Sequence, residues 1–336
     1  MVKVLLPRMS TGPGGVKRFS EEMVRQFREL TQTEPTLVHL HPADWDGGSR
    51  ARARKAWSAL TLSCIRQREP TFACFHVGWK SPVTVPLVGF VHDLRGPLTG
   101  GKQTVGRAEL LRSVPRLQRI SIRSWDVVCV PSPHVADDIA FLWPTATVEC
   151  IGEGIDHLAL AAPSDGSPRN SIVVIGGRMP HKRTDLGLEA ARQVAMNAAV
   201  DRIFVIGEPS GVQAAPDYTK VTSDDDWVAA LARARVAIAP TAYEGFGLAV
   251  GEALHAGVPV VYAKGSGLDW VVGGAGLSTT PAEGHMAEAA LSIWNNAASR
   301  VPQTEVQAQR FTWRNTATNA LTLLGCSAAT DPERDR

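Results

Sequence analysis

The chain has 336 residues, and 44% of them are hydrophobic. It is therefore long enough for two domains of ordinary size with a core each, and its composition excludes a fibre or a disordered tail. Its five cysteines are an odd number without a close pair, which indicates neither a disulfide framework nor a zinc knuckle. Because no run of 18 apolar residues and no signal-peptide pattern is present, we expect a cytoplasmic protein that spans no membrane.

The net charge of +2 conceals an imbalance along the chain. Residues 1–130 hold 20 Lys and Arg against 10 Asp and Glu, whereas residues 131–336 hold 15 against 23. Such polarity indicates either a basic surface for anionic partners or two domains of opposite charge that face one another. The sequence leaves both interpretations open.

Short runs rich in Val, Ile and Leu alternate with longer helical patterns in the first half of the chain. Strands are expected at 2–7, 36–41, 71–78, 85–93 and 125–132, and helices at 16–30 and 51–67. This alternation is typical of a parallel sheet wrapped by helices.

A polar, proline-rich segment at 161–170 interrupts the alternation, and we interpret it as a linker. The alternation then restarts, with strands expected at 171–177, 202–208, 236–240 and 259–263, and helices at 184–198, at 225–235 and after residue 247. We therefore predict an α/β fold with two doubly wound domains, residues 1–160 and 161–310, and a terminal helix at about 311–326. Such sheets bind ligands beyond the carboxyl ends of their strands, so two facing sheets predict a deep interdomain cleft.

Two glutamates stand in the nearly apolar stretch 240–263. Glu252 is the only Asp, Glu, Lys or Arg after Glu244 and before residue 264, and a buried carboxylate without partners is very costly. It lies either on the one wet face of a helix, in reach of His255, or against a ligand that carries hydroxyl groups. Glu244 precedes the small segment 245–247, where amides can approach a ligand, but an acid near a helix N-terminus is an equally good explanation.

Other candidate groups also follow strand patterns. Arg178 and Lys182 follow the first strand pattern of the second half, where two cations can stabilise a diphosphate and the charge it gains on leaving. Pairing with surface acids is the alternative role for them. His92 and Asp93 end the pattern 85–93, and a single His in such a place is more often structural than catalytic.

Taken in order, these segments resemble the retaining glycosyltransferases of family 4, whose GT-B architecture has two facing Rossmann-like domains. The most specific segment is PTAYEGFGLAVGEALHAGVPVV (240–261), in which Glu244 and Glu252 have the spacing of the family's paired-glutamate motif. The supporting matches are GGV (14–16), VHDL (91–94), VPSPHVADDIA (130–140), IGEGID (151–156) and GGRMPHKR (176–183). The resemblance extends over about residues 3–320, and it implies that the last helix crosses back to the first domain.

The resemblance also implies which residues hold a nucleotide-sugar donor. Glu252 would hold the ribose hydroxyl groups, Glu244 and the amides after it would hold the sugar, and Arg178 and Lys182 would clamp the diphosphate. His92 would contact the transferred sugar near the acceptor. The implied catalytic residues are His92, Arg178, Lys182 and Glu244, and the implied donor-binding residues are Gly14, Gly15, Arg178, Lys182, Glu244, Gly245, Phe246, Gly247, Leu248 and Glu252.

The activity implied by the resemblance is the retaining transfer of a hexose-type sugar from a nucleoside-diphosphate sugar to an acceptor hydroxyl, without a cofactor or a catalytic metal. The acidic run Asp224-Asp225-Asp226 fits this expectation, because acids are typical of the first turn of a helix. The acceptor stays open between a glycan, a glycolipid, a protein and a natural product. Two alternatives are an epimerase or hydrolase that acts on the nucleotide sugar alone, and a non-catalytic nucleotide-sugar-binding protein.

Four arginines fall on one side of a helical wheel in the segment 106–125, although Pro115 stands inside the pattern. The candidate acceptor-binding or anion-binding residues are Asp93, Arg112, Arg116 and Arg119, with Arg123 continuing the basic face. RARARK at 50–55 is a second basic cluster. An ordinary solvated helix face is one interpretation; a peripheral anionic membrane, a phosphorylated acceptor or a nucleic acid is the other, so a DNA-modifying transferase is a further alternative.

Overall fold

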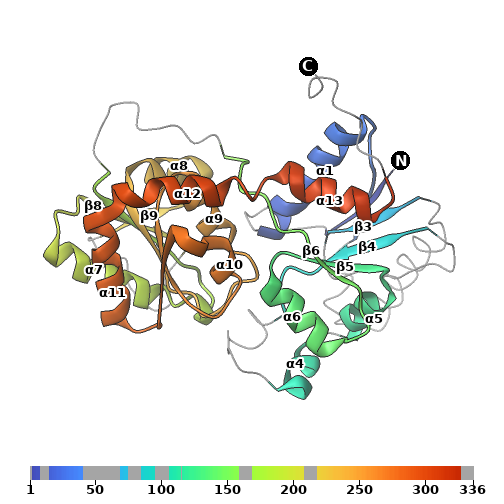
Figure 1. Ribbon diagram of the computed structural model, residues 1–336, viewed down its shortest axis with the longest axis horizontal. Helices are drawn as coiled ribbons and strands as arrows, with labels where there is room; N and C mark the ends of the chain where they lie inside the picture. The colour runs from blue at the N-terminus through green and yellow to red at the C-terminus, as the bar shows by residue number, and fades with distance from the viewer. Residues whose placement is uncertain are drawn as a thin grey trace. The chain divides into compact units, whose positions relative to one another are not determined.

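The computed structural model describes residues 2–7, 15–40, 69–74, 85–94, 106–114, 116–158, 169–207 and 218–326. The chain divides into two compact units: unit 1 comprises Met1–His92, Arg107–Gly154 and Trp313–Arg336, and unit 2 comprises Asp93–Gly106 and Ile155–Thr312. Each unit has a six-stranded sheet, which confirms the predicted α/β class (Figure 1). The expected helix at 51–67 lies outside the described residues, as does most of the expected linker.

Unit 1 contains a parallel sheet with the strand order β2-β1-β3-β4-β5-β6. Its strands are β1 (Lys3–Pro7), β2 (Thr36–Leu40), β3 (Thr71–Ala73), β4 (Leu87–Phe90), β5 (Val127–Val130) and β6 (Val148–Cys150). Its helices are α1 (Gly15–Thr31), α4 (Arg107–Ser113), α5 (Arg116–Ser124), α6 (Pro133–Leu142) and α13 (Trp313–Leu323).

The first and last helices of unit 1 lie side by side, although they come from opposite ends of the chain (Figure 1). Phe19, Met23 and Phe27 recur every four residues along α1 and are fully buried, which is the spacing of one helix face. Trp313, at the start of α13, is also fully buried, and its ring meets that of Phe19 edge-on with centroids 5.8 Å apart. Aromatic packing therefore fastens the end of the chain to its beginning.

Unit 2 contains a second parallel sheet with the order β12-β11-β10-β7-β8-β9. Its strands are β7 (Ser171–Ile175), β8 (Arg202–Ile206), β9 (Thr219–Val221), β10 (Ala234–Ala239), β11 (Val260–Ala263) and β12 (Gly276–Thr279). Its helices are α7 (Thr184–Asn197), α8 (Asp224–Arg233), α9 (Leu248–His255), α10 (Leu268–Val272), α11 (Glu283–Asn296) and α12 (Val301–Ala308).

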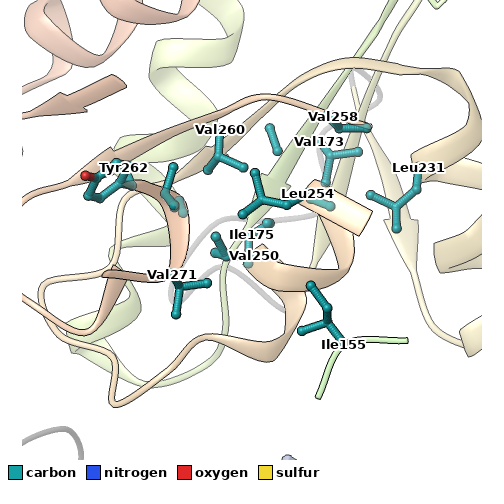
Figure 2. Packing of buried hydrophobic residues seen from close by; sticks show 14 of the residues in the cluster. Ile155, Val173, Ile175, Leu231, Val250, Leu254, Val258, Val260, Tyr262 and Val271 are labelled. Atoms are coloured by element: carbon teal, nitrogen blue, oxygen red, sulfur yellow. The ribbon is translucent and has the colours of Figure 1, made fainter. Parts of the chain in front are cut away.

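Strand β7 is buried on both faces, as expected for the centre of a parallel sheet. Alternate residues point to opposite sides. Ile172 and Val174 join the cluster that α7 and α11 cover, whereas Val173 and Ile175 join the cluster on the other face with α8 and α9 (Figure 2). Because β7 is the first strand of unit 2 and lies between β8 and β10, the chain order reverses between β7 and β10.

Two features bear on partners. Within the described residues, no helix is both long enough and apolar enough to cross a lipid bilayer. The single basic helix face expected around Pro115 is wrong, since α4 ends at Ser113 and α5 begins at Arg116. A proline has no amide hydrogen and clashes with the preceding turn, so the helix is interrupted there.

Candidate functional site

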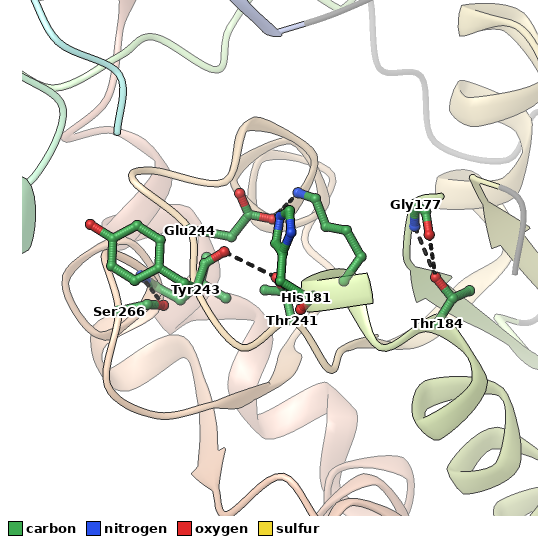
Figure 3. A network of polar contacts seen from close by, with 9 residues as sticks. Gly177, His181, Thr184, Thr241, Tyr243, Glu244 and Ser266 are labelled. Carbon is green, nitrogen blue, oxygen red and sulfur yellow. Dashed lines mark hydrogen bonds and ion pairs between the residues drawn. The ribbon is translucent and has the colours of Figure 1, made fainter. Parts of the chain in front are cut away.

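The candidate site of unit 2 lies beyond the carboxyl ends of β7 and β10. In open parallel sheets this is where ligands bind, because the loops after two neighbouring strands diverge where the strand order reverses. Here the two loops are tied together: the carbonyl oxygen of His181 accepts hydrogen bonds from the amide of Ala242 at 2.7 Å and from Oγ1 of Thr241 at 3.3 Å (Figure 3). The segments around Lys182 and Glu244 are therefore held side by side.

Lys182 and Glu244 form an ion pair between Nζ and Oε1 (Figure 3). The lysine side chain is 27% exposed and the glutamate side chain 19%, so both groups border solvent without projecting into it. The structure thus brings together two residues that the resemblance assigned to the diphosphate and to the sugar. In this state each of them neutralises the other.

Two glycines shape the loop that carries Glu244. Gly247 precedes α9 with φ at 90°, a left-handed conformation that favours glycine. A Cβ atom on Gly267 would collide with the carbonyl oxygen of Gly245, and the amide of Gly267 donates to the carbonyl oxygen of Glu244 at 2.9 Å. The loop therefore rests directly on the backbone around Gly267, which fixes the position of the glutamate.

The loop after β7 is fixed by a different device. The Thr184 hydroxyl group donates to the carbonyl oxygen of Gly177 and accepts from its amide, each at 2.9 Å (Figure 3). Arg183 takes the left-handed conformation with φ at 46°, which is unusual for a residue with a side chain. Strain of this kind persists where the surroundings over-determine the backbone, and it is common at ligand sites. Arg178, within the loop, is exposed.

Glu252 lies on α9 and is only 9% exposed, so the expectation of a wet helix face beside His255 is wrong. Nε1 of Trp227 donates to Oε2 at 2.6 Å, and Nε2 of His157 lies 3.0 Å from Oε1. Trp227 of α8 and His157 lie against the side of α9 that carries Glu252, which is why this side does not face solvent. Partners from distant segments therefore satisfy this carboxylate.

His92 lies in unit 1 and has partners at both ring nitrogens. Nδ1 lies 3.0 Å from Oε1 of Glu153, and Nε2 lies 3.0 Å from the carbonyl oxygen of Cys74. Both ring nitrogens are therefore held by oxygen atoms of unit 1. The ring also packs edge-on against Phe19 at a centroid distance of 4.8 Å. The structure thus holds His92 firmly, and its assigned contact with the sugar stays a prediction.

The positions of the other predicted site residues say less about a ligand. Gly15 begins α1 and is exposed, Phe246 is buried and Leu248 is half-buried, whereas Gly14 and the basic cluster at 50–55 lie outside the described residues. Asp93 is half-buried beyond the end of β4.

The four arginines of the expected basic face divide between two helices. Arg112 belongs to α4, and Arg116 begins α5. Arg119 on α5 is half-buried, with its Nε enclosed, and Arg123 is exposed. They therefore do not continue along one helix, because α4 ends at Ser113 and α5 begins at Arg116.

The acidic run does form the first turn of α8, as predicted. Asp226 and Ser223 make a reciprocal capping box, in which each side chain binds the backbone amide of the other. Among the residues that the structure describes, no group of three or more His, Cys, Asp or Glu side chains is arranged to hold a metal ion.

Four residues of these networks escaped the sequence analysis: Trp227, His157, His181 and Glu153. Each contacts a predicted site residue or is adjacent to one in the chain, and the motifs assigned no role to any of them. The one usable signal was adjacency, since His181 directly precedes Lys182 and Glu153 lies in the segment IGEGID. Burial lowers the pKa of His181, and the neighbouring charge of Lys182 lowers it further against the opposing effect of Glu244.

Residues 169–296, which form most of unit 2, match the family described as Glycosyl transferases group 1. The O-antigen chain mannosyltransferase B of Escherichia coli is 33% identical over 108 residues, which cover 31% of this chain and 28% of that protein. The MMP alpha-(1->4)-mannosyltransferase of Mycolicibacterium hassiacum is 27% identical over 211 residues, which cover 56% of this chain and 50% of that protein. The chain thus matches half or less of the length of these relatives.

A solved structure resembles the whole chain. HepE of Anabaena, in complex with UDP-glucose, has a TM-score of 0.63 and 19% identity, with 96% of this chain and 97% of that chain covered. At this identity the likeness shows a shared fold. Residues 169–296 therefore resemble the glycosyl transferases group 1 family, and the chain has the GT-B fold, with one six-stranded parallel sheet in each of its two units.

Proposed function

We propose that this protein is a retaining glycosyltransferase that moves a hexose-type sugar from a nucleoside-diphosphate sugar to an acceptor hydroxyl without a metal ion. One observation carries the proposal. Lys182 and Glu244, which are 62 positions apart in the sequence, meet where β7 and β10 end, inside the segment that matches the family. A cation and a carboxylate at the same sheet edge suit a ligand that has both phosphate and hydroxyl groups.

In this proposal, the bound donor separates the ion pair and gives each of its two side chains a new partner. The diphosphate takes Lys182, with the exposed Arg178 as a second cation, and Glu244 is left to accept hydrogen bonds from the sugar. Because the pair is partly buried, its charges are screened less than those of surface residues. The ion pair therefore holds both side chains in place before the donor arrives.

Glu252 is suited to the ribose even though it already has partners. A carboxylate has about four acceptor positions, two on each oxygen. Trp227 occupies one position on Oε2, and His157 lies against Oε1. One position on each oxygen is left for the two ribose hydroxyl groups, and the partners hold the carboxylate in a fixed orientation.

The proposed reaction breaks the bond between the anomeric carbon and the diphosphate oxygen and forms a bond from that carbon to the acceptor oxygen. The acceptor proton passes to the departing diphosphate on the same face of the sugar, which retains the configuration. Lys182 and Arg178 stabilise the charge that develops on the leaving group, which is the work that a divalent cation does in other transferases. Both relatives are mannosyltransferases, so a mannosyl donor is the first candidate.

The test is a thermal-shift screen of the purified chain with UDP-glucose, GDP-mannose, ADP-glucose and dTDP-glucose, with and without EDTA. A ligand that binds only the native state raises its stability, by about 2.7 kcal/mol at a concentration of 100 times Kd. We expect one donor to raise the melting temperature and EDTA to leave that shift unchanged. Failure of all four donors to shift the transition would refute the proposal.

Turnover assays with the donor so identified separate the alternatives. A transferase releases the nucleoside diphosphate at a much higher rate when an acceptor mixture is added. An epimerase or hydrolase would convert the donor at full rate without an acceptor, and a binding protein would convert none. Incorporation of label into DNA rather than into glycans or lipids would favour the DNA-modifying alternative.

A further inference from the structure

His181 combines deep burial with an unused polar atom. The residue is only 6% exposed, and among the described residues no hydrogen-bond partner of its Nδ1 is found. Most buried polar side-chain atoms in native proteins have such a partner, and leaving one without costs about 1–3 kcal/mol. An imidazole that served only to fill space would be replaced at no loss by an apolar side chain.

His181 directly precedes Lys182 in the loop after β7, and the charges of Lys182 and Glu244 both act on its ring (Figure 3). Its backbone is tied to the opposite loop through Ala242 and Thr241. The imidazole therefore cannot shift far. A ligand that enters the site would instead displace the ion pair of Lys182 and Glu244.

The protonation of the ring selects the kind of ligand atom. Burial and Lys182 lower the pKa of His181, so the ring is neutral near pH 7. A neutral imidazole has one donor and one acceptor nitrogen, which suits a hydroxyl group because a hydroxyl also donates and accepts. A diphosphate would gain more from the fixed charge of Lys182 beside it.

We propose that His181 is a sugar-binding residue, whose Nδ1 hydrogen-bonds a hydroxyl group of the transferred sugar once the donor has separated Glu244 from Lys182. This inference rests on the proposed nucleotide-sugar site and adds a contact that discriminates between sugars. It predicts that His181 affects the binding of the sugar moiety and not that of the nucleotide alone.

The test compares His181→Asn with His181→Gln. The Asn amide places a polar atom near the position of Nδ1, whereas the Gln amide reaches the position of Nε2, and both side chains are polar and smaller than or similar to His. Exposed His285 on α11 provides the control variant His285→Asn. Isothermal titration measures the Kd for UDP-glucose against UDP and for GDP-mannose against GDP, after thermal unfolding has shown that each variant is folded.

We expect His181→Gln to weaken the preference for the sugar nucleotide over the free diphosphate by about three- to tenfold, the value of one hydrogen bond, with the Kd for the free diphosphate unchanged within about twofold. His181→Asn and His285→Asn keep the preference. An unchanged preference in a folded His181→Gln overturns the inference, as does equal weakening of both ligands. If the unchanged protein binds neither sugar nucleotide, the proposed donor site itself fails and the inference falls with it.

Discussion

Replacing Glu252 by glutamine tests whether this carboxylate is a ligand of the nucleotide. The side chain is almost fully buried, and each of its oxygens faces one nitrogen, Nε1 of Trp227 at 2.6 Å and Nε2 of His157 at 3.0 Å. Glutamine has the same shape, so the replacement removes the charge and one acceptor oxygen without opening a cavity.

The expected loss of stability follows from these contacts. A hydrogen bond to a charged group contributes about 1.5–3 kcal/mol, and a neutral one about 0.5–1.5 kcal/mol. If the remaining oxygen stays against Trp227, that bond weakens by about 1 kcal/mol, and loss of the charge that faces Nε2 of His157 costs a similar or smaller amount. A total of about 1–2 kcal/mol lowers the melting temperature of a domain of this size by about 2–8 °C.

The same variant has a distinct effect on binding. Both the free nucleoside diphosphate and the nucleotide sugar contain ribose, so Glu252→Gln is expected to weaken both by about tenfold, in contrast to His181→Gln. Thermal unfolding and isothermal titration measure the two effects, with Glu288→Gln on the exposed face of α11 as the matched control. If the variant melts earlier but binds the nucleotide normally, Glu252 is structural and the ribose assignment is wrong.

Three further predictions concern the same sheet edge. Lys182→Met should lower kcat/KM by about 100-fold and the free energy of unfolding by no more than about 1 kcal/mol. A double-mutant cycle with Glu244→Gln should give a coupling of about 0.5–2 kcal/mol in unfolding, and additive effects in the cycle would contradict the ion pair. Because burial lowers the pKa of His181 below 6.5, the unfolded state binds more protons than the folded state as the pH falls through that value. Stability should therefore decline from about pH 7 toward pH 5, and it should decline less in His181→Asn. Equal pH profiles of the two proteins in urea unfolding would refute this. Gly267→Ala drives a Cβ into a backbone carbonyl and should cost about 2–4 kcal/mol and most donor binding. Gly274→Ala, whose added Cβ meets open space, should be nearly neutral in the same assays.

The sequence predicted the central strands of both sheets because those strands are buried on two faces and form continuous apolar runs. Three strands, β6, β9 and β12, were not predicted. All three lie at sheet edges and include exposed or half-buried residues such as Glu149, Lys220 and Ser278, so the apolar run that marks a central strand is missing. An edge strand forms because the neighbouring strand offers it hydrogen-bonding groups. The sequence of the edge segment does not indicate that neighbour.

The basic face shows a second limit of pattern reading. The arginine spacing indicated one helix, and the proline within it indicated a break; the structure has the break, with α4 and α5 on either side. Local stereochemistry prevailed over periodicity, because a proline removes a hydrogen bond whatever the side chains around it favour.

By itself the sequence determined the α/β class, the alternation of strands with helices and the identity of the residues at strand ends, since these depend on local periodicity and on the chemistry of single residues. Only the tertiary structure decided which of those residues meet. Lys182 and Glu244 pair because β7 and β10 are neighbours in the sheet, and Glu252 is buried rather than wet because Trp227 and His157 reach it from other elements. Contacts between distant segments depend on how the whole chain packs, and no local pattern records them.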